Sequence, residues 1–130
     1  MLSDAFRSAV EAEDADAMTD ALADDVVFRS PAVFTPYEGK PVVSAILVEG
    51  AAKVFEDFRY VDQIENDGVA ALIFQARVGD RQLDGLDLLR FDGDGKVSEL
   101  MVMVRPMSGL NALAEAMARR FEEAGIAPPA

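Results

Sequence analysis

The sequence predicts an α+β fold, with one long curved antiparallel sheet, helices before it and a further helix after it. Three observations support this class. Apolar residues recur at helical spacing in the first 55 residues, alternation and tight turns follow over residues 58–105, and helical spacing returns after Pro106. The chain has 130 residues, of which 51% are hydrophobic, so one domain over residues 1–130 can bury a core.

The first half of the chain contains short helical segments and one strand. Helical spacing predicts a helix over residues 2–10, and a second, shorter helix follows with Asp16 as its N-cap. Residues 26–29 predict a short strand. Residues 31–39 hold two prolines and a glycine and predict a loop. Pro41 suits the first turn of the next helix, which runs to about residue 55.

The second half predicts a meander of four strands. They are expected over residues 58–65, 69–78, 83–91 and 96–105. Asn66-Asp67-Gly68 is a strong hairpin signal. Asp92-Gly93-Asp94-Gly95 is similar to the start of a calcium-binding loop but lacks its closing glutamate, and therefore predicts another hairpin turn. Ser108 can cap the last helix, whose apolar face contains Leu110, Leu113, Ala114, Met117 and Phe121.

The last strand is apolar on both of its faces. Leu100, Val102 and Val104 alternate with Met101 and Met103, so both faces of the sheet need a cover. The helices cover one face. We expect a homodimer to cover the outer face, and the alternative is that the C-terminal helix folds over it.

Composition excludes several classes of function. The net charge of −12 argues against nucleic acid and anionic membranes as partners, because both need a positive surface. The sequence has no histidine and no cysteine, which removes serine triads, thiolate nucleophiles and the usual transition-metal ligands. We therefore expect no metal site and no cofactor. With neither a long apolar run nor a signal peptide, the expected location is cytoplasmic.

Several short motifs carry a resemblance to a known family. They are Ala23-Asp24-Asp25-Val26-Val27-Phe28 before Ser30-Pro31, Gly39-Lys40-Pro41, and Gly85-Leu86-Asp87-Leu88-Leu89-Arg90-Phe91 before the Asp92–Val97 turn. In this order, the chain resembles the nuclear transport factor 2-like superfamily, in its SnoaL-like and ketosteroid isomerase-like branch. The resemblance implies a cone-shaped fold in which the curved sheet wraps around the N-terminal helices and an apolar cavity.

Asp87 is the candidate catalytic residue that the resemblance implies. It matches the aspartate that ketosteroid isomerases use in protonated form as an oxyanion-hole donor. Burial between Leu86 and Leu88 would raise its pKa. The other isomerase residues are replaced, since Ser30 stands for the general base and Phe6 for the tyrosine donor. Gly85 stands where an epoxide hydrolase would carry arginine. These differences argue against a ketosteroid isomerase or a limonene epoxide hydrolase.

Six further residues are candidates for ligand binding. If strand parity holds, Gln75 and Arg77 lie on the same side of the sheet as Asp87, and an Arg77–Asp87 pair could orient a ligand. The alternative is a structural ion pair or solvent exposure. Tyr37, in the loop, either binds a ligand or anchors the loop. Ser30, Phe28 and Leu89 complete the set of residues expected around the cavity.

Two functions remain open at this point. In the first, the cone binds a small hydrophobic ligand without transforming it. In the alternative, the protein is a cofactor-independent isomerase, cyclase or hydrolase in which Asp87 performs acid–base chemistry on an apolar cyclic substrate. The missing partners of Asp87 favour the first function.

Overall fold

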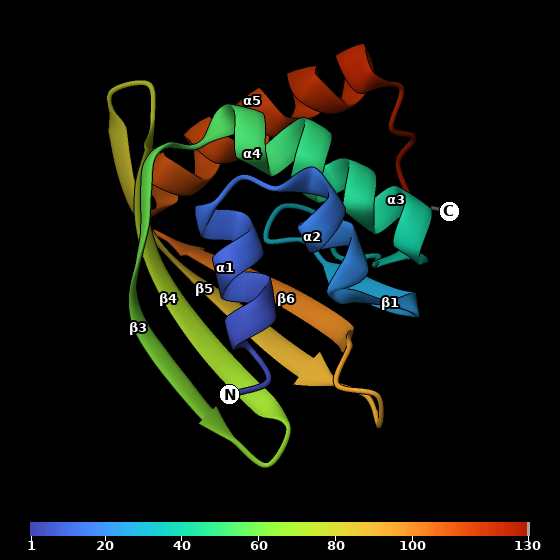
Figure 1. Cartoon of the computed structure of the whole chain (residues 1–130). Coiled ribbons are helices and arrows are strands. Elements are labelled where there is room, and N and C mark those ends of the chain that lie inside the picture. The colour runs from blue at the N-terminus through green and yellow to red at the C-terminus, as the bar shows by residue number, and fades with distance from the viewer. Residues whose placement is uncertain (130) are drawn as a thin grey trace.

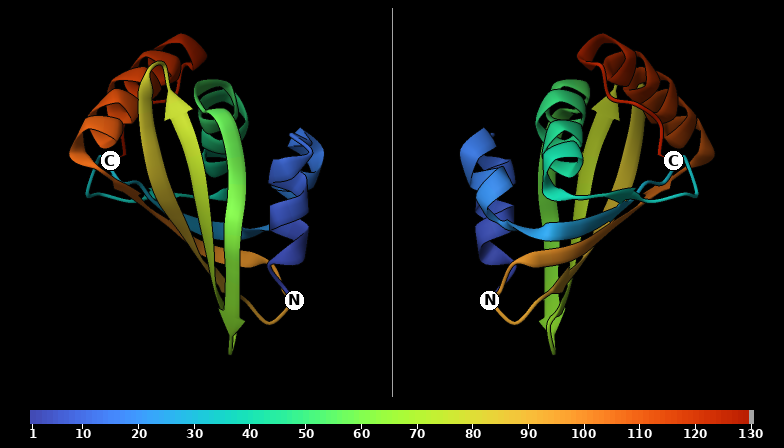
Figure 2. Two further views of the ribbon diagram at one scale, coloured as in Figure 1. Left: turned by 90° about the vertical axis from the view of Figure 1, so that its left-hand side faces the viewer. Right: turned by 90° about the vertical axis from the view of Figure 1, so that its right-hand side faces the viewer.

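The computed structural model describes residues 1–129 and consists of a curved sheet with helices on its concave face (Figures 1 and 2). The sheet has six strands in the order β2-β1-β6-β5-β4-β3. In chain order these are β1 Leu22–Arg29, β2 Tyr37–Glu38, β3 Glu56–Asn66, β4 Val69–Val78, β5 Arg81–Phe91 and β6 Val97–Arg105. Strands β3 to β6 form the expected antiparallel meander. The α+β fold class is confirmed, and the pairing of β1 with β6 adds one parallel contact.

Helices from both ends of the chain face the inner side of the sheet, because their residues line one cavity together with Asp87 and Leu100 of the sheet. The helices are α1 Asp4–Glu11, α2 Ala15–Asp20, α3 Lys40–Ala45, the π-helical stretch η1 Ile46–Ala51, α4 Ala52–Val54 and α5 Met107–Ala124. The last helix, α5, contacts β4, β5, β6 and η1. It therefore does not cover the outer face, and that alternative to a dimer is wrong. No helix in residues 1–129 is long and apolar enough to cross a membrane.

The boundaries in the first half of the chain differ from those expected. Asp14, rather than Asp16, caps α2, because its side chain accepts a hydrogen bond from the Ala17 amide. Strand β1 begins earlier than expected, at Leu22. It includes the exposed Asp24 and Asp25, and the register against β6 shifts at these residues. The expected loop contains the two residues of β2.

The helix expected over residues 41–55 is present as α3, η1 and α4 in succession. Its π-helical stretch packs closely against α5. A Cβ atom at Gly50 would lie 2.8 Å from Met117 Cε and 3.0 Å from a ring carbon of Phe121. Glycine at this position therefore lets the two helices approach each other.

The hydrophobic core lies between the concave face and the helices. Cross-strand partners share a face, so Leu72 and Phe74 of β4 point inward with Asp87 and Leu89 of β5. Phe6 of α1 is also fully buried in this layer. The inward-facing side chains of the sheet therefore form the hydrophobic core and also the sheet side of any cavity.

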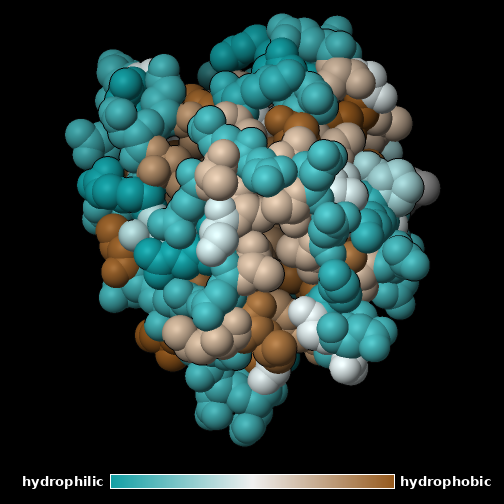
Figure 3. Space-filling view, in the orientation of Figure 1, coloured by the Kyte–Doolittle hydropathy of each residue, from teal (hydrophilic) through white to brown (hydrophobic). Residues whose placement is uncertain are grey.

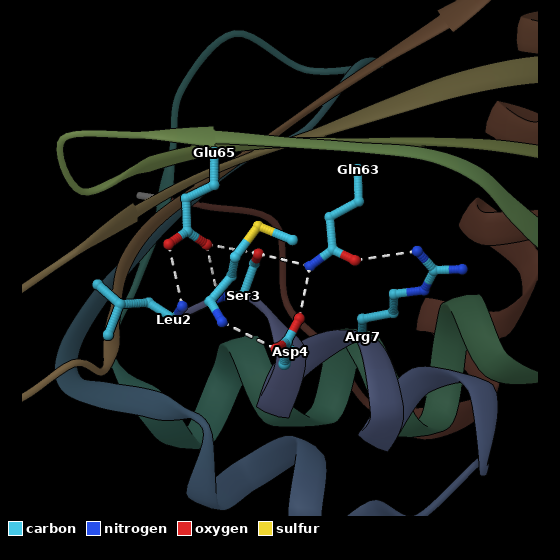
Figure 4. Close-up of polar contacts among 7 residues, drawn as sticks. Leu2, Ser3, Asp4, Arg7, Gln63 and Glu65 are labelled. Atoms are coloured by element: carbon cyan, nitrogen blue, oxygen red, sulfur yellow. Dashed lines mark hydrogen bonds and ion pairs between the residues drawn. The ribbon is translucent and has the colours of Figure 1, made fainter.

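A polar network fixes α1 onto the end of β3 (Figure 4). The Glu65 carboxylate accepts hydrogen bonds from the Leu2 amide at 3.0 Å, the Ser3 amide at 2.9 Å and the Ser3 hydroxyl at 2.6 Å. These bonds lower the pKa of Glu65. Gln63 donates to Ser3 and Asp4 and accepts from Arg7. The start of α1 is therefore capped by a side chain of the sheet.

Glu65→Gln should lower the free energy of unfolding by about 1 kcal/mol, as the loss of a helix cap does. The amide replaces one acceptor oxygen with a donor that faces an N–H group. Chemical denaturation of both proteins measures the difference. Asp62→Asn is the matched control, because Asp62 lies exposed on the same strand. Equal stability of the two variants would contradict a capping role for Glu65.

Candidate functional site

A cavity of about 570 Å³ lies between the inner face of the sheet and helices α1, η1 and α5. Its volume is in the range that holds a drug-sized molecule. Most of its lining is apolar, from Phe6 and Val10 on α1 to Leu113, Met117 and Phe121 on α5. Apolar residues also gather across the middle of the face shown in Figure 3, between hydrophilic regions. Both ends of the chain thus contribute to one apolar chamber.

The polar centre of the cavity is the pair Tyr60 and Asp87. The Tyr60 hydroxyl donates to Asp87 Oδ2 at 2.8 Å, and the two residues are 7% and 8% exposed. Burial raises the pKa of Asp87 to about 7, and the Tyr60 hydrogen bond opposes this rise. Burial, with the adjacent Asp87, holds the pKa of Tyr60 well above its usual value, so Tyr60 remains a hydrogen-bond donor.

Aromatic rings form the wall beside this pair. Phe58 stacks on Phe74 with ring centroids 4.8 Å apart and meets Tyr60 edge-on at 5.0 Å. The Phe74 ring lies over Gly85, where a Cβ atom would be 2.0 Å from the ring. Only glycine at this position leaves room for the ring, two residues from Asp87 on the same face of β5.

The Arg7 side chain of α1 lies over the ring of Tyr60, the partner of Asp87. Its guanidinium carbon is 5.7 Å from the centre of the Tyr60 ring, a cation–π distance, and its Nε is 3.2 Å from Glu11. The network that fixes α1 therefore also sets the surroundings of Tyr60. Tyr60 is absent from the candidates taken from the sequence, although the alternation of residues 58–65 places it on the same side as Phe58.

The structure brings four of the seven candidate residues to the cavity. Asp87, Phe28, Ser30 and Tyr37 line it. The Ser30 hydroxyl accepts a hydrogen bond from the Ala32 amide at 3.0 Å, and Tyr37 is buried against Phe28 and Phe121. The fifth candidate, Leu89, is fully buried in the core and is not part of the lining.

The placement expected for Gln75 and Arg77 is wrong. The cross-strand partner of Asp87 is Leu72, so even-numbered residues of β4 share its face and odd-numbered ones lie opposite. On the outer face, Arg77 pairs with Glu56 at 2.6 Å and with Asp57 at 2.7 Å. Gln75 accepts a hydrogen bond from Arg59 at 2.6 Å. An Arg77–Asp87 pair does not form.

The chemistry available in the cavity rests on one carboxyl group. The other acidic residues of the lining are Glu11, Glu13 and Glu122, and all are exposed. Within residues 1–129, no group of three or more acidic side chains is placed to hold a metal ion. A carboxyl with a pKa of about 7 can give or take a proton at neutral pH, and can also donate or accept a hydrogen bond.

Asp87→Asn should stabilise the protein more at about pH 8 than at about pH 5. The folded chain binds the Asp87 proton more tightly than the unfolded chain, whose pKa is near 3.8. Stability is therefore lost as pH rises from about 4 to about 7. Over the two pH units between about pH 5 and about pH 7, the free energy of unfolding of the wild type falls by about 3 kcal/mol. Denaturation at both pH values measures the difference between variant and wild type, and Asp84→Asn, on the outer face of the same strand, is the control. A difference that does not change with pH would contradict the burial of this carboxyl.

Comparison with known proteins agrees with this architecture. A family model described as a SnoaL-like domain matches residues 3–100. A structure of a steroid delta-isomerase from Pseudomonas aeruginosa is 46% identical, with a TM-score of 0.87, and the match covers 94% of this chain and 90% of that one. An uncharacterised protein with a cystatin-like fold from Silicibacter pomeroyi is 29% identical, with a TM-score of 0.88, over 93% and 85% of the two chains.

A putative ketosteroid isomerase from Kribbella flavida shares the fold, with 19% identity and a TM-score of 0.70 over 81% and 76% of the two chains. No curated protein is a significant match. The family model covers most of the chain, and the strands and helices follow the cone arrangement that the resemblance implied. The chain therefore belongs to the SnoaL-like domain family, within the nuclear transport factor 2-like superfamily.

Proposed function

We propose that the cavity binds a small apolar cyclic compound whose one polar group hydrogen-bonds to Asp87. The observation that carries this proposal is a buried carboxyl in an otherwise apolar chamber of about 570 Å³. Tyr60 occupies Oδ2, and no other hydrogen bond to Asp87 is found within residues 1–129. The second oxygen, Oδ1, is left for a ligand.

The shape of the lining supports a flat ring system. Phe58, Phe74 and Tyr60 present rings next to Asp87, and aromatic rings favour stacked or edge-to-face contacts with other rings. The 46% identical structure is that of a steroid delta-isomerase, and a steroid is such an apolar polycyclic compound. These two observations support an apolar polycyclic ligand.

The second candidate is an isomerase, cyclase or hydrolase-type enzyme in which Asp87 gives or takes the proton. A pKa of about 7 favours it, because proton transfer is most effective when the pKa lies near the working pH. Among residues 1–129 no separate buried base lines the cavity beside Asp87, and Ser30 is a hydroxyl that accepts a hydrogen bond from the Ala32 amide. Any turnover should therefore depend on Asp87 alone, and should be lost in Asp87→Asn.

Binding should be tested with naphthalene, with 2-naphthol, which adds one hydroxyl to it, and with 2-tetralone, a ketone on the same bicyclic carbon skeleton. In a thermal-shift assay, a ligand at about a hundred times its Kd adds about 2.7 kcal/mol to stability. We expect Asp87→Leu to raise the Kd of 2-naphthol and of 2-tetralone by about tenfold, which corresponds to one lost hydrogen bond. Naphthalene should be unaffected.

Asp84→Asn, on the outer face, is the matched control and should bind as the wild type does. If Asp87→Leu binds the oxygen-bearing compounds as tightly as the wild type, Asp87 is not the anchor. Turnover of a β,γ-unsaturated cyclic ketone, followed by the absorbance of the conjugated product, distinguishes the enzyme from the binding protein.

We also propose that a second copy of the chain covers the outer face of the sheet. Ile73, Leu86 and Met103 lie side by side across β4, β5 and β6, and Leu88 adjoins Met101. Met103 is 47% exposed. The charged residues around this row are largely paired with one another, as in Arg105–Asp84 and Arg77–Glu56. Two copies, each with a net charge of −12, can therefore meet here without strong repulsion.

Sedimentation velocity at micromolar concentration tests the dimer. Met103→Glu should shift the wild-type dimer to a monomer, because it places a charge in the apolar row. Met107→Glu is the control, since Met107 is exposed at the start of α5. A monomeric wild type, or an unchanged mass for Met103→Glu, would exclude this interface.

A further inference from the structure

The charged side chains that line the cavity are all acidic. Within residues 1–129, the lining includes Asp87 inside and Glu11, Glu13 and Glu122 at exposed positions, and it includes no lysine or arginine. Arg7 lies over the Tyr60 ring and is already bound to Glu11 and Gln63. The cavity thus offers negative charge and no free positive partner.

This composition works against anionic ligands. A carboxylate, sulfate or phosphate that entered the chamber would lose its hydration and find no cation to replace it, which is costly in an apolar site. The acidic residues of the lining and the net charge of −12 would also repel an anion before it entered.

The same residues suit a cation. Asp87 has one oxygen held by Tyr60 and the other oxygen unoccupied, so an ammonium group can donate to it. The rings of Tyr60, Phe58 and Phe74 stand beside this position, and aromatic faces attract a desolvated cation. Exposed acidic groups at the lining would steer such a ligand inward.

We propose that the preferred ligand is an apolar cyclic amine, bound in its protonated form with the ammonium group paired to the Asp87 carboxylate. This rests on the proposed function, because it uses the same cavity and the same anchor, and adds the charge of the ligand. The bound ammonium replaces the proton on Asp87, and Tyr60 continues to donate to the second carboxylate oxygen. The ring system fills the apolar space between the aromatic wall and α5.

The test uses three probes with one skeleton, namely 2-(aminomethyl)naphthalene, 2-(hydroxymethyl)naphthalene and naphthalene-2-carboxylate, with Kd measured by calorimetry at neutral pH. The wild-type protein should bind the amine about tenfold more tightly than the alcohol, which matches one cation–π and ion-pair contribution of about 1.4 kcal/mol. The carboxylate should bind at least about a hundredfold more weakly than the amine.

Asp87→Asn removes the negative charge but keeps the shape, and should abolish the advantage of the amine over the alcohol. Asp84→Asn, on the outer face, should retain it. If the alcohol binds as tightly as the amine to the wild type, the ligand is neutral: the inference is overturned and the proposed function stands. If the carboxylate binds as tightly as the amine, the inference is also overturned. If none of the probes and no neutral ring compound binds, both proposals fail.

Discussion

The hydrogen bond between Tyr60 and Asp87 is the interaction on which the character of the cavity depends. It joins β3 to β5 across β4, and it places a titratable carboxyl within an apolar wall. The bond stabilises the carboxylate, whereas burial favours the neutral acid, and the balance leaves the pKa of Asp87 at about 7. Either protonation state is therefore accessible at neutral pH, which makes the site suitable for binding as well as for proton transfer.

The rest of the fold holds this pair in an apolar chamber. At one end of the chain, Glu65 fixes α1, which places Phe6 in the core and Arg7 over the Tyr60 ring. At the other end, Gly50 lets α5 pack against η1, and α5 supplies the opposite wall. Gly85 leaves room for the Phe74 ring to pack over β5 in the wall beside Asp87. The cavity is thus a property of the whole chain, because segments far apart in sequence enclose it.

Much of the fold could be predicted from local signals, and less of the site could. The hairpin turns and the apolar strands indicated the meander, whereas Asp87 was singled out only by the family resemblance. Gln75 and Arg77 were misplaced because the start of β4 is apolar at both parities, so periodicity does not show which residues face inward; the register against β5 decides it. Tyr60 was missed because an aromatic residue in a strand usually fills a core, and only the three-dimensional contact with Asp87 reveals its role.

The most direct test of a buried Asp87 anchor is an NMR titration of the Asp87 carboxyl carbon, assigned by comparison with Asp87→Asn. We predict a midpoint near pH 7, and a still higher midpoint in Tyr60→Phe, which removes the hydrogen bond that favours the carboxylate. A midpoint near 3.8, the ordinary value of an aspartate, would show that the carboxyl is hydrated, and would contradict a buried anchor inside an apolar cavity.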